Sequence, residues 1–257
     1  MTFDFSSQFY DSIYSQKNYR SEVDLIKKIL SENGIKAANI LDVGCGTGNH
    51  SIILSEDKKL NILGVDQSYK MIKKAEQKSS QIDNLHFVRR DMLSINDLDM
   101  KFDVIIALFH VLNYLRDNSE LRKFFSIVRS MLKEEGIFIF DTWNGNLCTK
   151  DRFRETTISF QHENENWKRI SHPELHRSNQ KVKIDFEFQK SFITQFRETH
   201  TLSYWTIEQI VELSLPHFSE THQYESIEGD RFIADLHWSP LFVMKPKKTT
   251  DKLEPVL

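Results

Sequence analysis

Three of the chain's eight glycines, Gly44, Gly46 and Gly48, lie within five consecutive residues. Glycine lets the backbone approach a ligand closely and adopt conformations that other residues avoid. The cluster follows an apolar run and precedes a helical pattern, and ligands bind at this position in open α/β sheets. The N–H groups that begin such a helix attract anionic groups. We interpret the cluster as a binding loop, with a tight strand-to-helix turn as the alternative.

The Gly-x-Gly-x-Gly spacing differs from the dinucleotide fingerprint and from the phosphate loop. Instead, ILDVGCGTGNH (40–50) resembles the first motif of class I S-adenosylmethionine-dependent methyltransferases. Four further segments resemble the motifs that follow it in this family: DQSYKMIKKA (66–75), DML (91–93), FDVIIALFHVLNYL (102–115) and LKEEGIFIFD (132–141). Five matches in order over residues 39–141 identify the chain as a member of this family.

The resemblance implies a site for S-adenosylmethionine, with S-adenosylhomocysteine as the product. Asp66, at the end of the second expected strand, is placed to accept hydrogen bonds from both ribose hydroxyls. Asp91 would accept from the adenine amino group, with Met92 and Leu93 as an apolar surface beside the ring. Met71 fits the same wall and fits a core position equally well. The candidate cofactor-binding residues are Tyr19, Arg20, Asp42, Gly44, Cys45, Gly46, Gly48, Asn49, His50, Asp66, Gln67, Met71, Asp91, Met92, Leu93 and Leu108.

Two residues are candidates for catalysis. Methyl transfer from a sulfonium is an in-line displacement, so the enzyme mainly aligns the nucleophile, the methyl group and the sulfur. A general base is needed only where the acceptor arrives protonated. His110 follows the fourth expected strand, and an ordinary histidine pKa of about 6.5 suits proton removal near neutrality. A structural histidine is an equal alternative, and Tyr14 is the second catalytic candidate.

The acceptor-binding candidates are Tyr10, Tyr114, His200, Tyr204 and Arg154. By resemblance, the tyrosines of the N-terminal segment would close over the site, and Tyr114 would either hydrogen-bond the acceptor or pack in the core. Within RETHTLSYW (197–205), alternation puts His200, Leu202 and Tyr204 on one strand face, either facing the acceptor or forming a mixed core. Four arginines could bind a phosphate-bearing acceptor or lie on the solvated surface: Arg152, Arg154, Arg169 and Arg177.

A narrower resemblance concerns the acceptor. An aromatic N-terminal segment, the HVLNYL loop, the FDTWNG turn and a β-rich insertion are together similar to bacterial methyltransferases of nucleotide-linked amino sugars. This resemblance implies methylation of an amine on a nucleotide-linked sugar, with O-methylation of a sugar or related metabolite as the close alternative. A non-catalytic module that binds the cofactor and a partner is the alternative from another class.

Composition excludes other classes. The chain has 34 basic and 37 acidic residues, so no global positive field favours nucleic acid. The absence of an Asn/Asp-Pro-Pro-aromatic motif after the fourth expected strand also disfavours nucleic-acid bases. No apolar run approaches a membrane span and no secretory signal begins the chain, so we expect a cytoplasmic protein. Cys45 and Cys148 cannot form a zinc cluster, Cys45 is better read as a small loop residue than as a nucleophile, and we expect no metal.

The elements that must position these residues alternate between strand and helix. Apolar runs predict strands over residues 39–43, 60–66, 85–91, 102–109 and 136–143. Helical spacing predicts helices over 1–38, 49–57, from Ser68 onward, over 119–133 and, capped by Thr206, over 206–215. Period-two alternation over 150–205 predicts an antiparallel sheet, and further strands are expected near 217–226 and 240–245.

These elements predict an α/β fold with a doubly wound, mainly parallel seven-stranded sheet and an inserted antiparallel sheet. We expect residues 1–149 and 206–246 to form the cofactor-binding domain and residues 150–205 to cover the acceptor site. Residues 247–257 read as a disordered tail. An exposed edge of the inserted sheet is a candidate homodimer interface.

Overall fold

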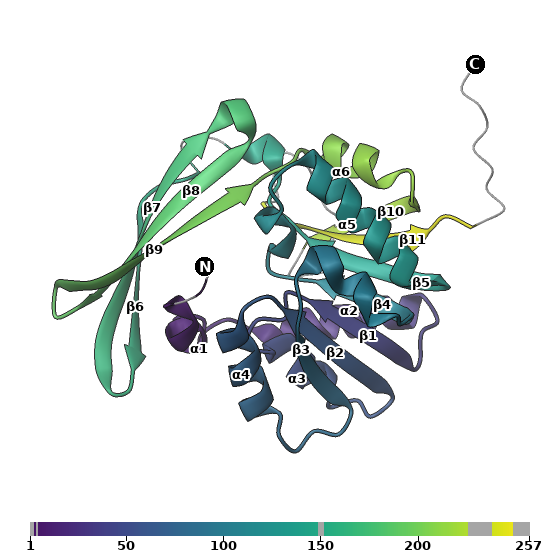
Figure 1. The fold of residues 1–257 in the computed structure, drawn as a ribbon, viewed down its shortest axis with the longest axis horizontal. Helices are drawn as coiled ribbons and strands as arrows, with labels where there is room; N and C mark the ends of the chain where they lie inside the picture. Colours follow the sequence, from purple (N-terminus) through teal and green to yellow (C-terminus); the bar gives the residue numbers. More distant parts are fainter. Residues whose placement is uncertain (1–2, 4, 149–151, 226–237, 249–257) are drawn as a thin grey trace.

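The computed structural model describes residues 3, 5–148, 152–225 and 238–248. Its centre is a seven-stranded sheet of order β10-β11-β5-β4-β1-β2-β3 (Figure 1). The parallel strands are β1 (Ala38–Val43), β2 (Leu60–Asp66), β3 (Leu85–Arg89), β4 (Phe102–Ala107) and β5 (Leu132–Asp141). The antiparallel strands β11 (Pro240–Pro246) and β10 (Phe218–Glu225) complete it. The predicted fold class is confirmed.

Helices cover both faces of this sheet because its central strands are apolar on both sides. Leu41 of β1 belongs to the core beneath α5 (Asn118–Met131) and α6 (Ile207–Ser214). Its neighbour Ile40 belongs to the opposite core, beneath α2 (Tyr19–Glu32), α3 (Asn49–Leu54) and α4 (Tyr69–Lys78). Successive strand residues point to opposite faces, so one short strand serves both layers.

Two predicted helix starts are confirmed at their caps. The Ser68 side chain accepts from the Met71 N–H at the start of α4. Thr206 and Gln209 form a capping box at the start of α6, in which each side chain accepts from the other's backbone N–H. Both caps satisfy N–H groups that the first turn of a helix leaves unpaired.

The prediction that residues 1–38 are helical is confirmed only in part. The segment holds the 3₁₀ turn η1 (Ser6–Phe9), the short helix α1 (Tyr10–Ile13) and then α2. The chain leaves helical geometry after α1, and the side chain of Asn18 begins α2 anew by accepting from the Ser21 N–H. The third strand is also shorter than predicted, since Asp91 caps the 3₁₀ segment η2 (Met92–Leu98).

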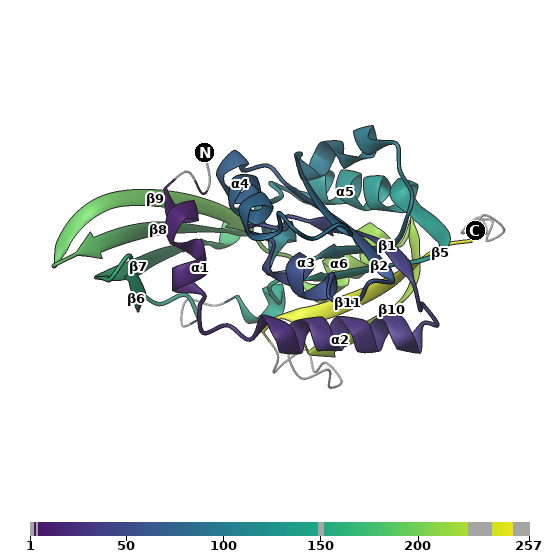
Figure 2. The same ribbon diagram turned by 90° about the horizontal axis from the view of Figure 1, so that it is seen from below.

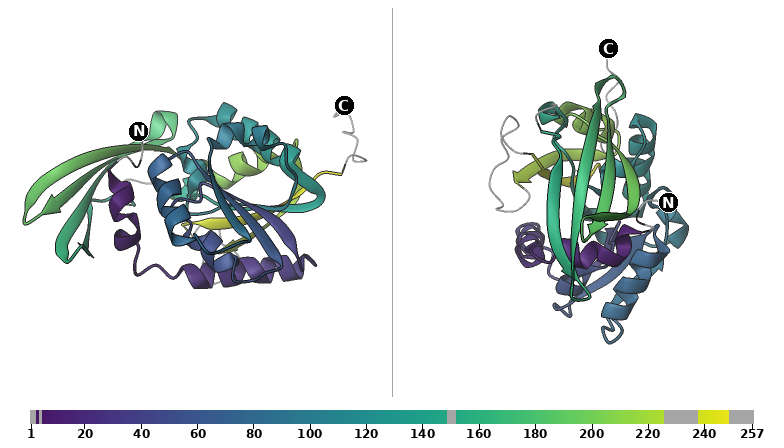
Figure 3. Two further views of the ribbon diagram at one scale, coloured as in Figure 1. Left: turned by 60° about the horizontal axis from the view of Figure 1, so that its bottom comes forward. Right: turned by 90° about the vertical axis from the view of Figure 1, so that its left-hand side faces the viewer.

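The predicted antiparallel sheet is present as a separate four-stranded sheet that projects from one end of the molecule (Figure 1). Its strands, in spatial order, are β6 (Thr156–His162), β7 (Glu165–His176), β8 (Lys181–Lys190) and β9 (Ile193–Ser203). The segment η1–α1 lies between this sheet and the main body (Figures 2 and 3). Phe9 and Ile13 pack there against Phe160 and Phe188.

Among the described residues, no helix is both long and apolar enough to cross a membrane. The predicted tail lies outside the described residues except for residues 247 and 248.

Candidate active site

The glycine loop lies at the carboxyl end of β1. Gly44, Gly46 and Gly48 all have positive φ, at 70°, 55° and 79°. A methyl group added to Gly44 would come within 2.5 Å of the Val111 side chain, whereas one added to Gly46 would meet nothing within 4 Å. Gly44 thus packs against the loop after β4, and Gly46 faces open space, where a ligand has room to approach the backbone.

Asp66, the last residue of β2, holds this loop in place. Its Oδ2 accepts from the Gly46 N–H at 3.0 Å and its Oδ1 accepts from the Ser68 N–H at 2.8 Å. Burial raises the pKa of this carboxyl, an effect that these two hydrogen bonds oppose. Each carboxylate oxygen can accept more than one hydrogen bond, so Asp66 retains capacity for a ligand.

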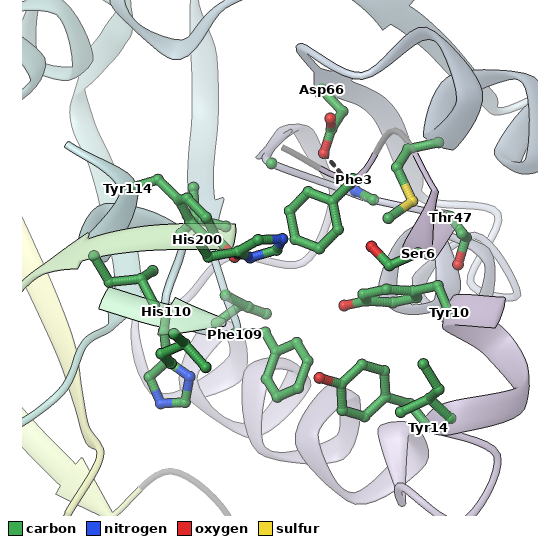
Figure 4. A pocket seen from close by; sticks show the side chains of 18 of the residues that line it. Phe3, Ser6, Tyr10, Tyr14, Thr47, Asp66, Phe109, His110, Tyr114 and His200 are labelled. Carbon is green, nitrogen blue, oxygen red and sulfur yellow. Dashed lines mark hydrogen bonds between the residues drawn. The ribbon is translucent and has the colours of Figure 1, made fainter. Parts of the chain in front are cut away.

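A cavity of about 440 Å³ lies between the carboxyl end of the main sheet, η1–α1 and the second sheet (Figure 4). Most of the predicted site residues line it, and the structure brings cofactor and acceptor candidates to the same space. Those that line it are Tyr10, Tyr14, Tyr19, Gly44, Cys45, Gly46, Asn49, His50, Asp66, Gln67, Met71, Met92, Leu108, His110, Tyr114, Arg154 and His200.

Three predicted cofactor residues lie elsewhere. The exposed guanidinium of Arg20 makes a two-bond ion pair with Glu56, at 2.8 Å for each bond, and does not line the cavity. The buried carboxylate of Asp42 accepts from the Ser51 hydroxyl at 2.5 Å, behind the loop. Gly48 packs against the Phe87 ring, where a Cβ would approach within 2.5 Å. Asp42 and Gly48 thus shape the loop from its far side.

Three further predicted residues also lie off the cavity. The Asp91 carboxylate accepts from the Leu93 N–H at 2.8 Å as the cap of η2, and Leu93 packs against the core. Tyr204 packs with Cys148 and Val182 in a separate apolar cluster. Tyr204 follows the end of β9 at Ser203, and its ring lies in the apolar cluster and not in the cavity.

His110 is fixed by a carboxylate from the neighbouring strand. Phe109 and His110 both have left-handed backbones, with φ of 67° and 63°, and the His110 N–H donates to Asp141 Oδ1 at 2.9 Å. Strained residues of this kind persist where their surroundings hold them, often at functional sites. The Ser239 hydroxyl donates to Asp141 Oδ2 at 3.3 Å and lies 2.9 Å from His110 Nε2. Ser239 thus links the side chain of Asp141 to the His110 ring and fixes the orientation of that ring.

Burial lowers the pKa of His110, an effect that Asp141 opposes. The imidazole is therefore neutral near neutral pH and able to accept a proton. Asp141 and Ser239 orient the His110 ring, and no local sequence pattern indicated that these two residues would lie beside it.

Aromatic side chains form much of the remaining wall (Figure 4). The ring of Tyr14 stands edge-on to that of Phe109, with centroids 5.0 Å apart, and Tyr10 lies 4.9 Å from Tyr14. Lining residues that sequence reasoning missed include Phe3, Ser6, Thr47, Phe109, Trp143 and Phe186. Thr47 belongs to the glycine loop itself, and its hydroxyl donates to Asp11 at 2.6 Å, which ties α1 to that loop.

Three of the four arginines considered above line the cavity. Arg169 donates to the Tyr14 hydroxyl at 3.1 Å and stacks on the Phe186 ring at 4.9 Å. Arg152 lies 4.8 Å from the centre of the Trp238 ring, and Arg154 lies beside the same space. Arg177 begins the turn η5 (Arg177–Asn179) between β7 and β8 and does not line the cavity.

Comparisons with known proteins agree with this architecture. A family model described as a methyltransferase domain matches residues 35–200. A putative methyltransferase, YqeM of Bacillus subtilis, is 34% identical over 154 residues, which span 60% of this chain and 60% of that protein. The chain thus spans less than two thirds of the length of this relative.

Two solved structures share the fold. An S-adenosylmethionine-dependent methyltransferase from Clostridium acetobutylicum superposes with a TM-score of 0.77 at 22% identity, covering 94% of this chain and 97% of the other. The sugar N-methyltransferase KedS8 from a Streptoalloteichus species gives a TM-score of 0.75 at 21% identity, with 93% of each chain covered. At these identities the likeness is one of fold. With the family model matched over residues 35–200, the chain belongs to the methyltransferase-domain family.

Proposed function

We propose that the protein is an S-adenosylmethionine-dependent methyltransferase that methylates the amine of a nucleotide-linked amino sugar. The observation that carries this proposal is one cavity whose two ends have different chemistry. The glycine loop and Asp66 form one end. His110, tyrosines and arginines form the other.

The residues at the first end fit the cofactor. Gly46 offers open space next to the backbone, and Asp66 offers carboxylate oxygens to ribose hydroxyls. Met71, Met92 and Leu108 give this end an apolar surface suited to a purine ring. When bound, S-adenosylmethionine supplies an electrophilic methyl group on a sulfonium. The chain's own part is to orient both reactants and to exclude water, since alignment supplies much of the rate of a displacement.

The second end fits a sugar amine carrying a nucleotide. The neutral His110 can accept a proton where the amine arrives as an ammonium group, and an amine that binds neutral needs no such base. Tyr10 and Tyr14 enclose the space next to His110. Arg152, Arg154 and Arg169 offer positive charge to a diphosphate farther along the cavity. The named activity of KedS8, whose fold is shared, supports a sugar amine as the acceptor.

O-methylation of a sugar hydroxyl is the second candidate, and the Asp141–His110 arrangement favours it. A hydroxyl must lose its proton during transfer, and a carboxylate-oriented histidine is suited to removing it.

The test is methylation of matched nucleotide sugars, followed by mass spectrometry. The purified chain is incubated with S-adenosylmethionine and with UDP-glucosamine, UDP-glucose or free glucosamine. Methylation of UDP-glucosamine alone is the expected result, and Asp66→Ala is the control that should abolish it. Methylation of UDP-glucose instead would show that the acceptor is a hydroxyl and would contradict the proposed amine. A wider panel of nucleotide-linked amino sugars is then tested. If the protein binds the cofactor but methylates none of them, the proposed acceptor class is overturned.

A further inference from the structure

Glu198 of β9 is a buried carboxylate that no part of the proposed chemistry uses. Five donors surround it. Its Oε1 accepts from the Phe3 N–H at 2.7 Å, the Ser6 hydroxyl at 2.8 Å and His200 Nε2 at 2.7 Å. Its Oε2 accepts from the N–H groups of Phe5 and Ser6, both at 3.0 Å. A carboxylate with this many donors is a built feature of the fold, since leaving a buried charge unpaired is costly.

Four of these donors come from the start of the chain, which we call the strap and define as Phe3, Phe5 and Ser6. Phe3 and Ser6 line the cavity, so the strap forms part of its wall (Figure 4). Phe3 has a φ of 65°, unfavourable for a bulky residue, and its ring stands edge-on to His200 with centroids 4.7 Å apart. Glu198 is therefore what holds the strap against the second sheet.

The fifth donor sets the protonation of His200. Burial opposes ionisation of Glu198, but hydrogen bonds from His200 and Ser6 outweigh it and lower the pKa to about 2. An ionised carboxylate can only accept, so His200 Nε2 carries a proton. In the tautomer that carries its proton on Nε2, Nδ1 is an acceptor, and it lies 2.9 Å from the Tyr114 hydroxyl. Burial raises the pKa of Tyr114 well above 10, so this phenol keeps its proton and donates it to Nδ1.

We propose that Glu198 is a positioning residue that, through His200, turns the Tyr114 oxygen into an obligate hydrogen-bond acceptor toward the cavity while fastening the strap. The consequence for the methyl acceptor rests on the proposed function. The group bound beside Tyr114 must be an N–H or O–H donor, such as a sugar amine or hydroxyl. A carboxylate or other pure acceptor is rejected there.

The first test needs no ligand. ¹⁵N NMR of the imidazole nitrogens, with the His200 signals assigned by His200→Gln, reports the tautomer near neutral pH. The Nε2–H tautomer is expected, and an Nδ1–H tautomer or an imidazolium would overturn the proposal. In Glu198→Gln the amide NH₂ replaces either Oε1, which faces His200 and the Phe3 N–H, or Oε2, which faces the N–H groups of Phe5 and Ser6. Either the tautomer changes or hydrogen exchange of residues 3–14 accelerates, and a variant that changes neither contradicts the proposal.

Glu187→Gln is the matched control. Glu187 lies on the adjacent strand β8 and pairs with Arg197 away from the strap and His200. The His200 tautomer and the hydrogen exchange of residues 3–14 should both be the same in this variant as in the wild type.

A second test uses UDP-glucosamine as the probe with the cofactor-loaded enzyme. Tyr114→Phe and Glu198→Gln should each raise KM several-fold with little change in kcat. The double variant should be no worse than the more affected single variant, because both act on one hydrogen bond. Multiplied effects on KM would show that Glu198 acts independently of Tyr114. If the wild type does not methylate this probe, the proposed acceptor is in question, while the NMR and exchange results still decide the role of Glu198.

Discussion

The Gly46 N–H donates to the Asp66 carboxylate at 3.0 Å, so the acid that ends β2 holds the glycine loop that follows β1. The two strands pair in parallel, with Val43 beside Val65, and their carboxyl ends therefore meet at one edge. This explains why an acid 20 residues from Gly46 belongs to the same site. It also means that changing Asp66 alters the loop itself as well as the proposed contact with the ribose hydroxyls.

Replacing Asp42 should make the protein more stable in alkaline solution. Burial raises the pKa of this carboxyl from 3.8 to about 6, so its favourable contribution is present at low pH and lost as pH rises through about 6. Asp42→Asn mimics the protonated form and keeps an acceptor for Ser51. It should raise the free energy of unfolding at about pH 8 by up to about 3 kcal/mol.

The measurement is urea denaturation of both proteins at about pH 4.5 and about pH 8. The gain from Asp42→Asn should be clearly larger at the higher pH. An equal difference at both pH values would contradict the pKa assigned to Asp42.

His110→Ala separates the two acceptor chemistries. An amine that binds neutral needs no strong base, so the loss in kcat/KM should stay below about tenfold, whereas loss of a base acting on a hydroxyl costs about 10²–10⁴-fold. Asp141→Asn should reproduce part of the effect, since Asp141 orients the ring. Steady-state kinetics with UDP-glucosamine, measured over a range of pH, distinguishes the amine acceptor from the hydroxyl acceptor. A large loss that high pH does not rescue would count against the amine acceptor.

Arg169→Met tests the phosphate-binding end of the cavity. A charge-assisted hydrogen bond contributes about 1.5–3 kcal/mol, so its loss should raise the KM for UDP-glucosamine about tenfold or more. The KM for free glucosamine should rise less, since that substrate has no phosphate and loses only what the hydrogen bond from Arg169 to the Tyr14 hydroxyl contributes. Arg177→Met is the matched control because Arg177 lies outside the cavity. Equal effects of the two variants would refute phosphate binding by Arg169.

Arg20→Ala should leave cofactor affinity within about twofold of the wild type. The guanidinium is exposed and paired with Glu56, and surface ion pairs of this kind contribute little. Calorimetric titration with S-adenosylhomocysteine measures the affinity. A tenfold or greater loss would mean that Arg20 leaves Glu56 and enters the site when the ligand binds.

Much of the fold follows from local patterns. The continuous apolar run FDVIIA predicts β4 because a strand covered on both faces must be apolar throughout. Ser68 and Thr206 predict helix starts because their side chains satisfy N–H groups within three residues. Where the chain leaves a helix or strand was harder to predict, as the break before Asn18 shows.

The site residues that could be predicted are those whose type and position at the end of a strand already indicate a binding role. Asp66 and the glycine loop have such signals, since parallel strands bring their carboxyl ends together. The orientation of His110 depends on Ser239, which lies 129 residues away in the sequence. Glu198 is one of several acidic residues in strands of alternating polarity, so its local sequence does not distinguish it from the others. Arg20, predicted to bind the cofactor, pairs with Glu56 in the structure and does not line the cavity. Contacts between residues so far apart in the sequence leave no local pattern from which they could be predicted.

Calorimetric titration of S-adenosylmethionine into the wild type and into Asp66→Asn tests the central claim most directly. The control for a lost charge is Asp103→Asn on β4, which alters a surface ion pair with Lys133 of β5. The wild type and the control should bind alike, and Asp66→Asn should bind at least about tenfold more weakly while remaining folded. Equal affinity in all three proteins, or no binding by the wild type, would contradict the assignment of this cavity as the cofactor site.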